Sequence, residues 1–195
     1  MDRRDFLKTV AVSGAAMTIQ RSEAMEILTQ AVNSTGKPDL VAVMGDEPEL
    51  MFQRAIAELG GMKQFVKSGQ KVVVKPNIGW DKVPELAGNT NPKLVAEIVK
   101  QCFAAGAKEV TVFDHTCDDW QKCYKNSGIE SAAKAAGAKV MPAHLESYYR
   151  SVDLPKGKNM KKAKIHEAIL NCDVWINVPI LKNHGGANLT IAMKN

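Results

Sequence analysis

The chain has 195 residues, of which 45% are hydrophobic, 24% charged and 6% aromatic. This is ordinary globular usage, and it excludes a disordered, collagen-like or coiled-coil protein. The formal net charge of +5 is modest and does not by itself indicate nucleic-acid binding, and four cysteines are too few for a disulfide scaffold.

The first 24 residues are predicted to be a twin-arginine export signal. The segment RRDFLK at positions 3–8 precedes an apolar run, 9–19, that is too short to cross a bilayer. Ser22 and Ala24 are small residues of the kind that a signal peptidase reads, so cleavage before Met25 is expected. Export by the twin-arginine machinery predicts a periplasmic or exported protein. The alternative is an uncleaved amphipathic helix.

Beyond a linker, 25–39, the predicted domain at 40–195 alternates β-branched runs with helical patterns. Five runs are predicted to be strands: 41–44, 71–75, 109–113, 138–141 and 173–178. Four segments have helical patterns: 49–59, 92–105, 128–136 and 160–170. Asn91 and Pro92 are a start signal for the second of these helices, and Gly106 is a stop signal.

This order of elements predicts an α/β fold. The strand interiors are continuously apolar, so a doubly wound, mostly parallel sheet with helices on both faces is expected. Right-handed crossovers bring the carboxyl ends of the strands to one edge, and ligands of such sheets bind there, near a switch in strand order. Candidate functional residues are therefore those that directly follow the strands.

Lys75 and Asn77 end the predicted strand 71–75, with Pro76 fixing the turn and Gly79 allowing the backbone to approach a ligand closely. They are candidates for binding an anionic or carbonyl-bearing ligand. The alternative is structural: the Lys75 ammonium reaches water at the strand end, and Asn77 caps a turn.

Asp114 and His115 follow the strand 109–113, and an acid beside an imidazole can transfer a proton or ligate a metal. A helix cap is the alternative role for Asp114. Cys117 and Cys123 come next, at a spacing that is not typical of zinc or iron–sulfur sites. In an exported protein they either form a disulfide or remain thiols.

The last predicted strand runs into a polar loop that contains Lys182, His184, Gly185 and Gly186. Backbone N–H groups at the two glycines are candidates for binding an anion, which Lys182 and Lys194 would neutralise. His184 is a candidate for ligating a metal or transferring a proton. The phosphate-binding patterns GxxxxGK[ST] and GxGxxG do not occur in the sequence.

A basic run lies between the last two predicted strands, and its members are Lys156, Lys158, Lys161, Lys162 and Lys164. No aromatic residues are interleaved, so the run is interpreted as a solvated face rather than a nucleic-acid patch. No nucleic-acid partner and no stable membrane span are expected.

Three blocks together resemble the bacterial and archaeal domain-of-unknown-function 362 family: VVVKPNIGW at 72–80, AGAKEVTVFDH at 105–115 and DVWINVPILKNHGGANLTIAMKN at 173–195. Members share a KPN block after an early strand and an NxPxxKxH block that leads to a KN pair. The resemblance spans about residues 40 to 195, and twin-arginine leaders are common in the family.

The resemblance has further implications. Some members carry ferredoxin-type cysteine motifs and are iron–sulfur proteins, but this chain has no CxxCxxC motif. The family pattern continues beyond a pair such as Lys194-Asn195, so the chain is expected to be an N-terminal fragment with a sheet truncated at its C-terminal end. A weaker likeness to the N-terminal half of nickel-pincer lactate racemases, where lysine and histidine hold the cofactor, is only an analogy.

The predicted function is binding of an anionic small molecule or a metal-containing cofactor at the C-terminal edge of the sheet of an exported protein. Its enzymatic form is a redox or isomerase enzyme. The candidate catalytic residues are Asp114, His115 and His184. The candidate ligand-binding residues are Lys75, Asn77, Lys182, Gly185, Gly186 and Lys194. The alternative is a non-catalytic periplasmic binding or assembly module that recognises an anionic partner.

Overall fold

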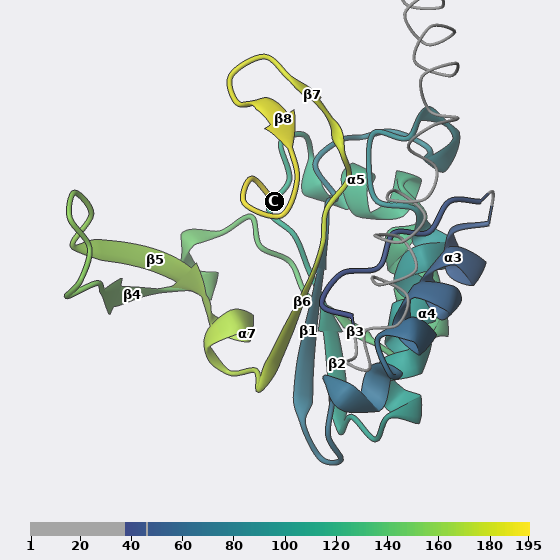
Figure 1. Cartoon of the computed structure of the whole chain (residues 1–195). Helices are drawn as coiled ribbons and strands as arrows, with labels where there is room; N and C mark the ends of the chain where they lie inside the picture. Colours follow the sequence, from purple (N-terminus) through teal and green to yellow (C-terminus); the bar gives the residue numbers. More distant parts are fainter. Residues whose placement is uncertain (1–37, 46) are drawn as a thin grey trace, which may run out of the picture. The chain divides into compact units, whose positions relative to one another are not determined.

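Four parallel strands form the central sheet of the computed structural model, which describes residues 38–45 and 47–195. The strands are β1 (Lys71–Pro76), β2 (Glu109–Val112), β3 (Lys139–Val140) and β6 (Val174–Val178). Their order is β3-β2-β1-β6, so β1 has β2 on one side and β6 on the other, and the winding reverses there (Figure 1). The predicted α/β fold with a parallel sheet is confirmed. The predicted export signal and nearly all of the linker lie outside the described residues.

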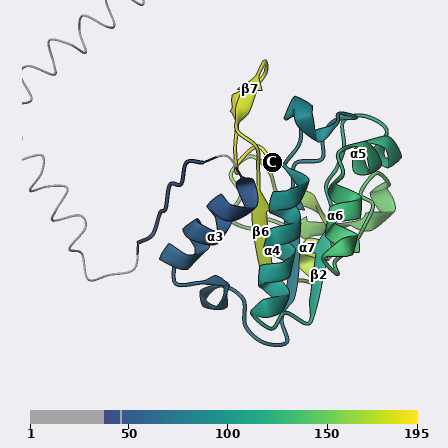
Figure 2. The same ribbon diagram turned by 90° about the vertical axis from the view of Figure 1, so that its right-hand side faces the viewer.

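One face of the sheet is covered by α3 (Pro48–Glu58), α4 (Pro92–Ala104) and α6 (Ile129–Ala135), with α3 beside α4 (Figure 2). The buried residues of α4 recur at helical spacing: Val95, Ile98, Val99 and Cys102. They join the inward valines of β1 and β2 in one core cluster. Asn91 caps α4 by accepting a hydrogen bond from Lys93 N at 2.9 Å, and Gly106 follows the helix end with a φ of 104°, as the sequence predicts.

The opposite face is covered more thinly. The short helix α7 (Glu167–Leu170) packs there, and its Ala168 and Ile169 contact a small buried cluster of Val73, Phe113 and Ala143. Helices therefore cover both faces of the sheet, as expected, but one face carries three helices and the other only the short α7 among the described residues.

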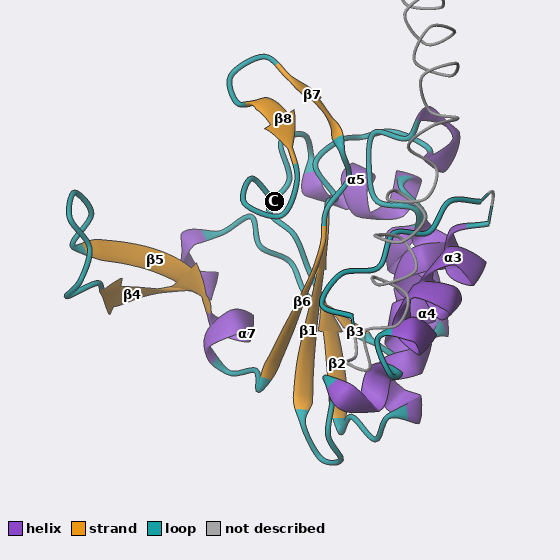
Figure 3. Cartoon of the chain, in the orientation of Figure 1, coloured by secondary structure: helices purple, strands orange, loops and turns teal. Residues whose placement is uncertain are grey.

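Two antiparallel hairpins extend the fold (Figure 3). One pairs β4 (Tyr149–Asp153) with β5 (Lys162–His166), and the other pairs β7 (Lys182–His184) with β8 (Asn188–Thr190). The helix predicted at 160–170 is therefore wrong over β5 and right only over α7.

The reason lies in the alternation along β5. Lys162 and Lys164 are exposed while Ala163 and Ile165 are half-buried, which is the two-residue period of a strand. His166 then ends the strand and caps α7, since its Nδ1 accepts a hydrogen bond from Ala168 N at 3.1 Å. Burial lowers the pKa of His166, which agrees with a neutral ring that accepts this bond.

The strand predicted at 41–44 is also wrong. These residues form no strand and pair with none in the described part of the chain, and Met44 is 94% exposed. The remaining elements are α5 (Trp120–Asn126) and three short 3-10 helices, η1 (Met62–Gln64), η2 (Pro84–Leu86) and η3 (Glu146–Tyr148). Within residues 38–45 and 47–195, no helix combines the length and the apolar character that crossing a membrane requires.

Candidate functional site

The loops that follow β1, β2 and β6 surround a pocket of about 460 Å³ at the carboxyl edge of the sheet. Seven of the nine candidate catalytic and ligand-binding residues line it: Lys75, Asn77, Asp114, His115, Lys182, His184 and Lys194. Gly185 and Gly186 lie in the turn between β7 and β8, outside the lining. The pocket is next to the switch point between β1 and β6, the position at which parallel α/β sheets generally bind ligands.

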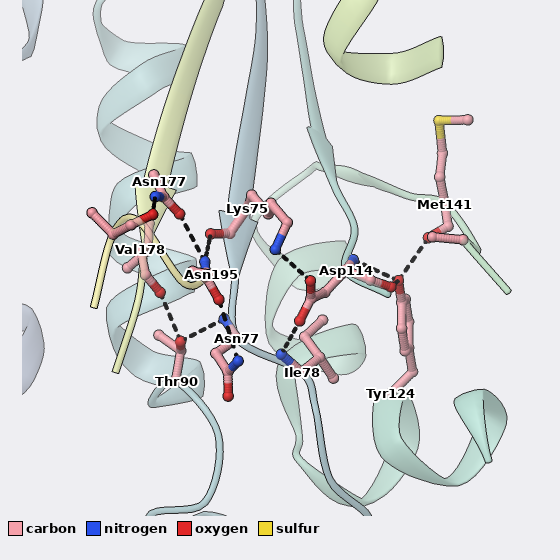
Figure 4. Close-up of polar contacts among 12 residues, drawn as sticks. Lys75, Asn77, Ile78, Thr90, Asp114, Tyr124, Met141, Asn177, Val178 and Asn195 are labelled. Carbon is pink, nitrogen blue, oxygen red and sulfur yellow. Dashed lines mark hydrogen bonds and ion pairs between the residues drawn. The ribbon is translucent and has the colours of Figure 1, made fainter. Parts of the chain in front are cut away.

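Lys75 and Asp114 form an ion pair at the end of β1 (Figure 4). The distance from Lys75 Nζ to Asp114 Oδ1 is 2.5 Å, and the two side chains are 14% and 5% exposed. The other carboxylate oxygen accepts a hydrogen bond from Ile78 N at 2.7 Å. The charge of Lys75 is therefore already balanced by the protein, and Asp114 fixes the loop after β1 instead of capping a helix.

Tyr124, on α5, holds the backbone of Asp114 in place. Its hydroxyl accepts a hydrogen bond from Asp114 N at 2.8 Å and lies 2.8 Å from Asp114 O and 3.0 Å from Met141 O. Burial raises the pKa of Tyr124, so the phenol remains protonated and can donate to a carbonyl. These hydrogen bonds fix the backbone of the residue whose carboxylate pairs with Lys75.

Three asparagines join β1 and β6 at the switch point (Figure 4). The Asn195 side-chain amide donates to Lys75 O at 3.1 Å and to Asn177 Oδ1 at 2.7 Å, and its oxygen accepts from Asn77 Nδ2 at 3.2 Å. Asn195 therefore closes one wall of the pocket, although it is 118 positions from Asn77 in the chain.

Thr90 makes a second connection between the same strands. Its hydroxyl accepts from Asn77 N at 2.8 Å and donates to Val178 O at 2.8 Å, and Thr90 N donates to Asn77 O at 2.9 Å. The residue is 3% exposed, so these bonds are shielded from water.

Lys182 enters the pocket from β7 and meets only neutral partners. Its ammonium donates to Asn77 Oδ1 at 2.9 Å and to Gly88 O at 2.6 Å, and it lies 5.9 Å from the centre of the Trp80 ring. Burial lowers the pKa of Lys182, and the positive charge of Lys194 also lowers it, whereas Cys117 and Asp114 act in the opposite direction and raise it. Neither lysine forms a salt bridge with any carboxylate in the described part of the chain.

The two histidines line the pocket in different ways. His115 is exposed, and its ring meets Tyr149 edge-on at 6.4 Å. His184 Nδ1 accepts hydrogen bonds from Gly186 N at 3.1 Å and Ala187 N at 2.9 Å, so a neutral ring carries its proton on Nε2. The Gly186 N–H that was expected to meet an anion is therefore engaged by His184.

The four cysteines are free thiols in the structure. Cys117 is exposed and lines the pocket, whereas Cys102 and Cys123 are buried and Cys172 is half-buried. Burial raises the pKa of Cys123 to about 11. Among the described residues, no group of three or more His, Cys, Asp and Glu side chains is arranged to hold a metal ion.

Sequence reasoning did not predict the roles of four residues in the candidate site. Thr90 and Trp80 lie in loops whose partners come from distant strands, and nothing local marks them. Asn177 and Asn195 belong to the family-like block at 173–195, but the motif did not indicate that their side chains would hydrogen-bond to each other beside the end of β1.

A comparison with protein-family models matches residues 72–195 to a domain of unknown function, DUF362. A comparison with curated proteins finds 26% identity over 137 residues with the thylakoid-associated protein sll1697 of Synechocystis sp.. The match covers 70% of this chain and 41% of the relative, so the chain spans about two fifths of the length of that curated protein. No solved structure matches the chain.

Proposed function

The chain belongs to the domain-of-unknown-function 362 family, and from this premise we propose that its pocket binds a small anionic molecule. The observation that carries the proposal is the half-buried Lys182 ammonium, whose hydrogen bonds in the described part of the chain go to an amide oxygen and a backbone carbonyl and which lies near the face of Trp80. A half-buried cation without a salt bridge is stabilised when an anion in the pocket supplies a direct counter-charge.

The charge balance of the pocket supports the same proposal. Lys75 and Asp114 neutralise each other, so Lys182 and Lys194 remain as uncompensated positive charges on its wall. The repulsion between them is reduced when an anion lies between the two ammonium groups. Trp80, Pro179 and Ile180 add apolar walls, which suit the organic part of a carboxylate or phosphate ester.

Of the two predicted ligands, an anion and a metal-containing cofactor, the side chains favour the anion. The described residues offer no cluster of three or more metal-ligating side chains, and Nδ1 of His184 is occupied by two backbone donors. His115 and the free Nε2 of His184 are the groups that would move a proton in the enzymatic form. In the non-catalytic form, the same lysines only recognise the anion.

The exposed thiol of Cys117 gives a direct test, because it lies in the pocket with the two lysines. Iodoacetate and iodoacetamide are of similar size and both alkylate the thiolate, but only iodoacetate is an anion. We expect the ratio of their rates at Cys117 to fall about tenfold in Lys182→Gln and in Lys194→Gln, since each change removes a positive charge near the reacting sulfur. Mass spectrometry of the Cys117 peptide measures both rates.

Lys125→Gln is the matched control, since Lys125 is an exposed lysine of α5 that does not line the pocket. Its rate ratio should equal that of the wild type. Using the ratio cancels any change in the pKa of the thiol, which affects both reagents alike. An unchanged ratio in both pocket variants would show that the lysines do not attract anions and would contradict the proposal.

We also propose that residues 1–24 direct export through the twin-arginine pathway. The double variant Arg3→Lys, Arg4→Lys keeps the charge but removes the arginine pair that the export receptor reads, so it is expected to remain in the cytoplasm. Cell fractionation and immunoblotting measure this, and Lys8→Arg, which should still be exported, is the control. Equal export of the wild type, the double arginine variant and Lys8→Arg would rule out export through the twin-arginine pathway.

A further inference from the structure

The β4–β5 hairpin, residues 149–166, carries the net charge of the protein. It contains six lysine or arginine residues and one aspartate, a formal charge of +5, which equals that of the whole chain. Outside the hairpin, the numbers of basic and acidic residues in the sequence are equal, so their formal charges cancel. This charge lies on an element that contributes nothing to the lining of the pocket.

The uncompensated part of this charge is at the turn of the hairpin. Along the strands, Arg150 pairs with Glu167 and Lys164 with Glu146, and Lys162 pairs with Asp153 where the strands meet the turn. Within the turn, 154–161, three exposed lysines have no carboxylate partner among the described residues: Lys156, Lys158 and Lys161. Met160 stands among them with 61% of its surface exposed.

The hairpin holds this turn in a defined position. At its base, the Tyr149 hydroxyl donates to Ala143 O at 2.9 Å, and the His166 ring stacks on Phe113 with 4.0 Å between ring centres. At the turn, Leu154 N donates to Lys161 O at 2.8 Å. Figure 1 shows the hairpin standing clear of the sheet, on the side away from α3 and α4. The lysines and the methionine are thus presented together at an exposed tip.

We propose that this tip docks the protein on an anionic membrane surface. Clustered lysines are attracted to acidic headgroups, and an exposed methionine between them can enter the boundary between headgroups and acyl chains. The turn has no aromatic side chain on which a nucleic-acid base could stack, so the lysines and methionine fit a lipid surface better than a single strand. This surface is separate from the pocket, and docking does not depend on what the pocket binds.

Sedimentation of the full chain with vesicles tests the proposal. The probes are phosphatidylcholine vesicles with and without roughly 30% phosphatidylglycerol. We expect the wild type to bind only the anionic vesicles, and less as the salt concentration rises. Replacing Lys156, Lys158 and Lys161 by Gln should weaken this binding roughly 100-fold. Met160→Ser should weaken it about threefold.

The matched control replaces Lys63, Lys100 and Lys125 by Gln, which lowers the net charge equally at exposed lysines outside the hairpin. It should bind within about threefold of the wild type. Residues 1–24 are identical in all of these chains, so their contribution cancels. Equal losses in the two triple variants, unweakened binding by the hairpin variant or by Met160→Ser, or equal binding to neutral vesicles would overturn the proposal. Tighter binding of the tip to a single-stranded oligonucleotide would also overturn it, in favour of a nucleic-acid partner.

Discussion

An Asp114→Asn chain is expected to unfold with a free energy about 3 kcal/mol below that of the wild type. The side chains of Asp114 and Lys75 are 5% and 14% exposed, and their ion pair is 2.5 Å long. The new amide keeps an oxygen that can accept from Ile78 N, so the main change is a nearly buried lysine without a counter-charge. Urea denaturation at neutral pH, followed by circular dichroism, measures the difference.

Glu109→Gln is the control for this prediction. Glu109 and Lys139 form a similar ion pair between β2 and β3, but these side chains are 32% and 67% exposed. Water already solvates them, so a loss below about 1 kcal/mol is expected. Adding Lys75→Met to Asp114→Asn should restore most of the lost stability, because it removes the stranded charge. Equal losses in the two single variants would show that burial does not set the strength of the Lys75–Asp114 pair.

Much of the fold follows from local sequence patterns. The apolar runs of β1 and β2 and the cap and stop signals of α4 each act within a few residues, and the predicted elements occur there. The β4–β5 hairpin was missed because its alternating strand, ending at His166, continues directly into the helix-forming segment of α7. Composition alone did not separate the strand from the helix.

The site was predictable only in part, for a similar reason. Lys75, Asn77 and Asp114 were found because the topology brings every parallel strand end to one edge, whatever their separation in sequence. Which side chains then meet depends on packing. Asp114 forms an ion pair with Lys75, and Asn77 hydrogen-bonds to both Lys182 and Asn195. These partners are far apart in the sequence, so no local motif predicts the contacts. Asp114 thereby balances the charge of Lys75, whereas Lys182 and Lys194 form no salt bridge among the described residues.

Thr90→Val is expected to lower the free energy of unfolding by roughly 3 kcal/mol, since valine keeps the shape of threonine but loses its hydroxyl. That hydroxyl accepts from Asn77 N and donates to Val178 O, both at 2.8 Å, and it joins the ends of β1 and β6. Valine leaves a buried donor and a buried acceptor without partners, which costs more than losing a solvent-exposed hydrogen bond.

Thr111→Val is the internal comparison for this change. Thr111 is 5% exposed on β2, and within the described chain its side chain has no hydrogen-bond partner, so valine should alter the stability by less than about 0.5 kcal/mol. Thr90→Val should also reduce the preference of Cys117 for iodoacetate, because Asn77, which Thr90 positions, accepts a hydrogen bond from Lys182. Thermal and urea unfolding measure the stabilities of both variants. Equal effects of the two substitutions would mean that the hydroxyl of Thr90 does not hold the strand ends together.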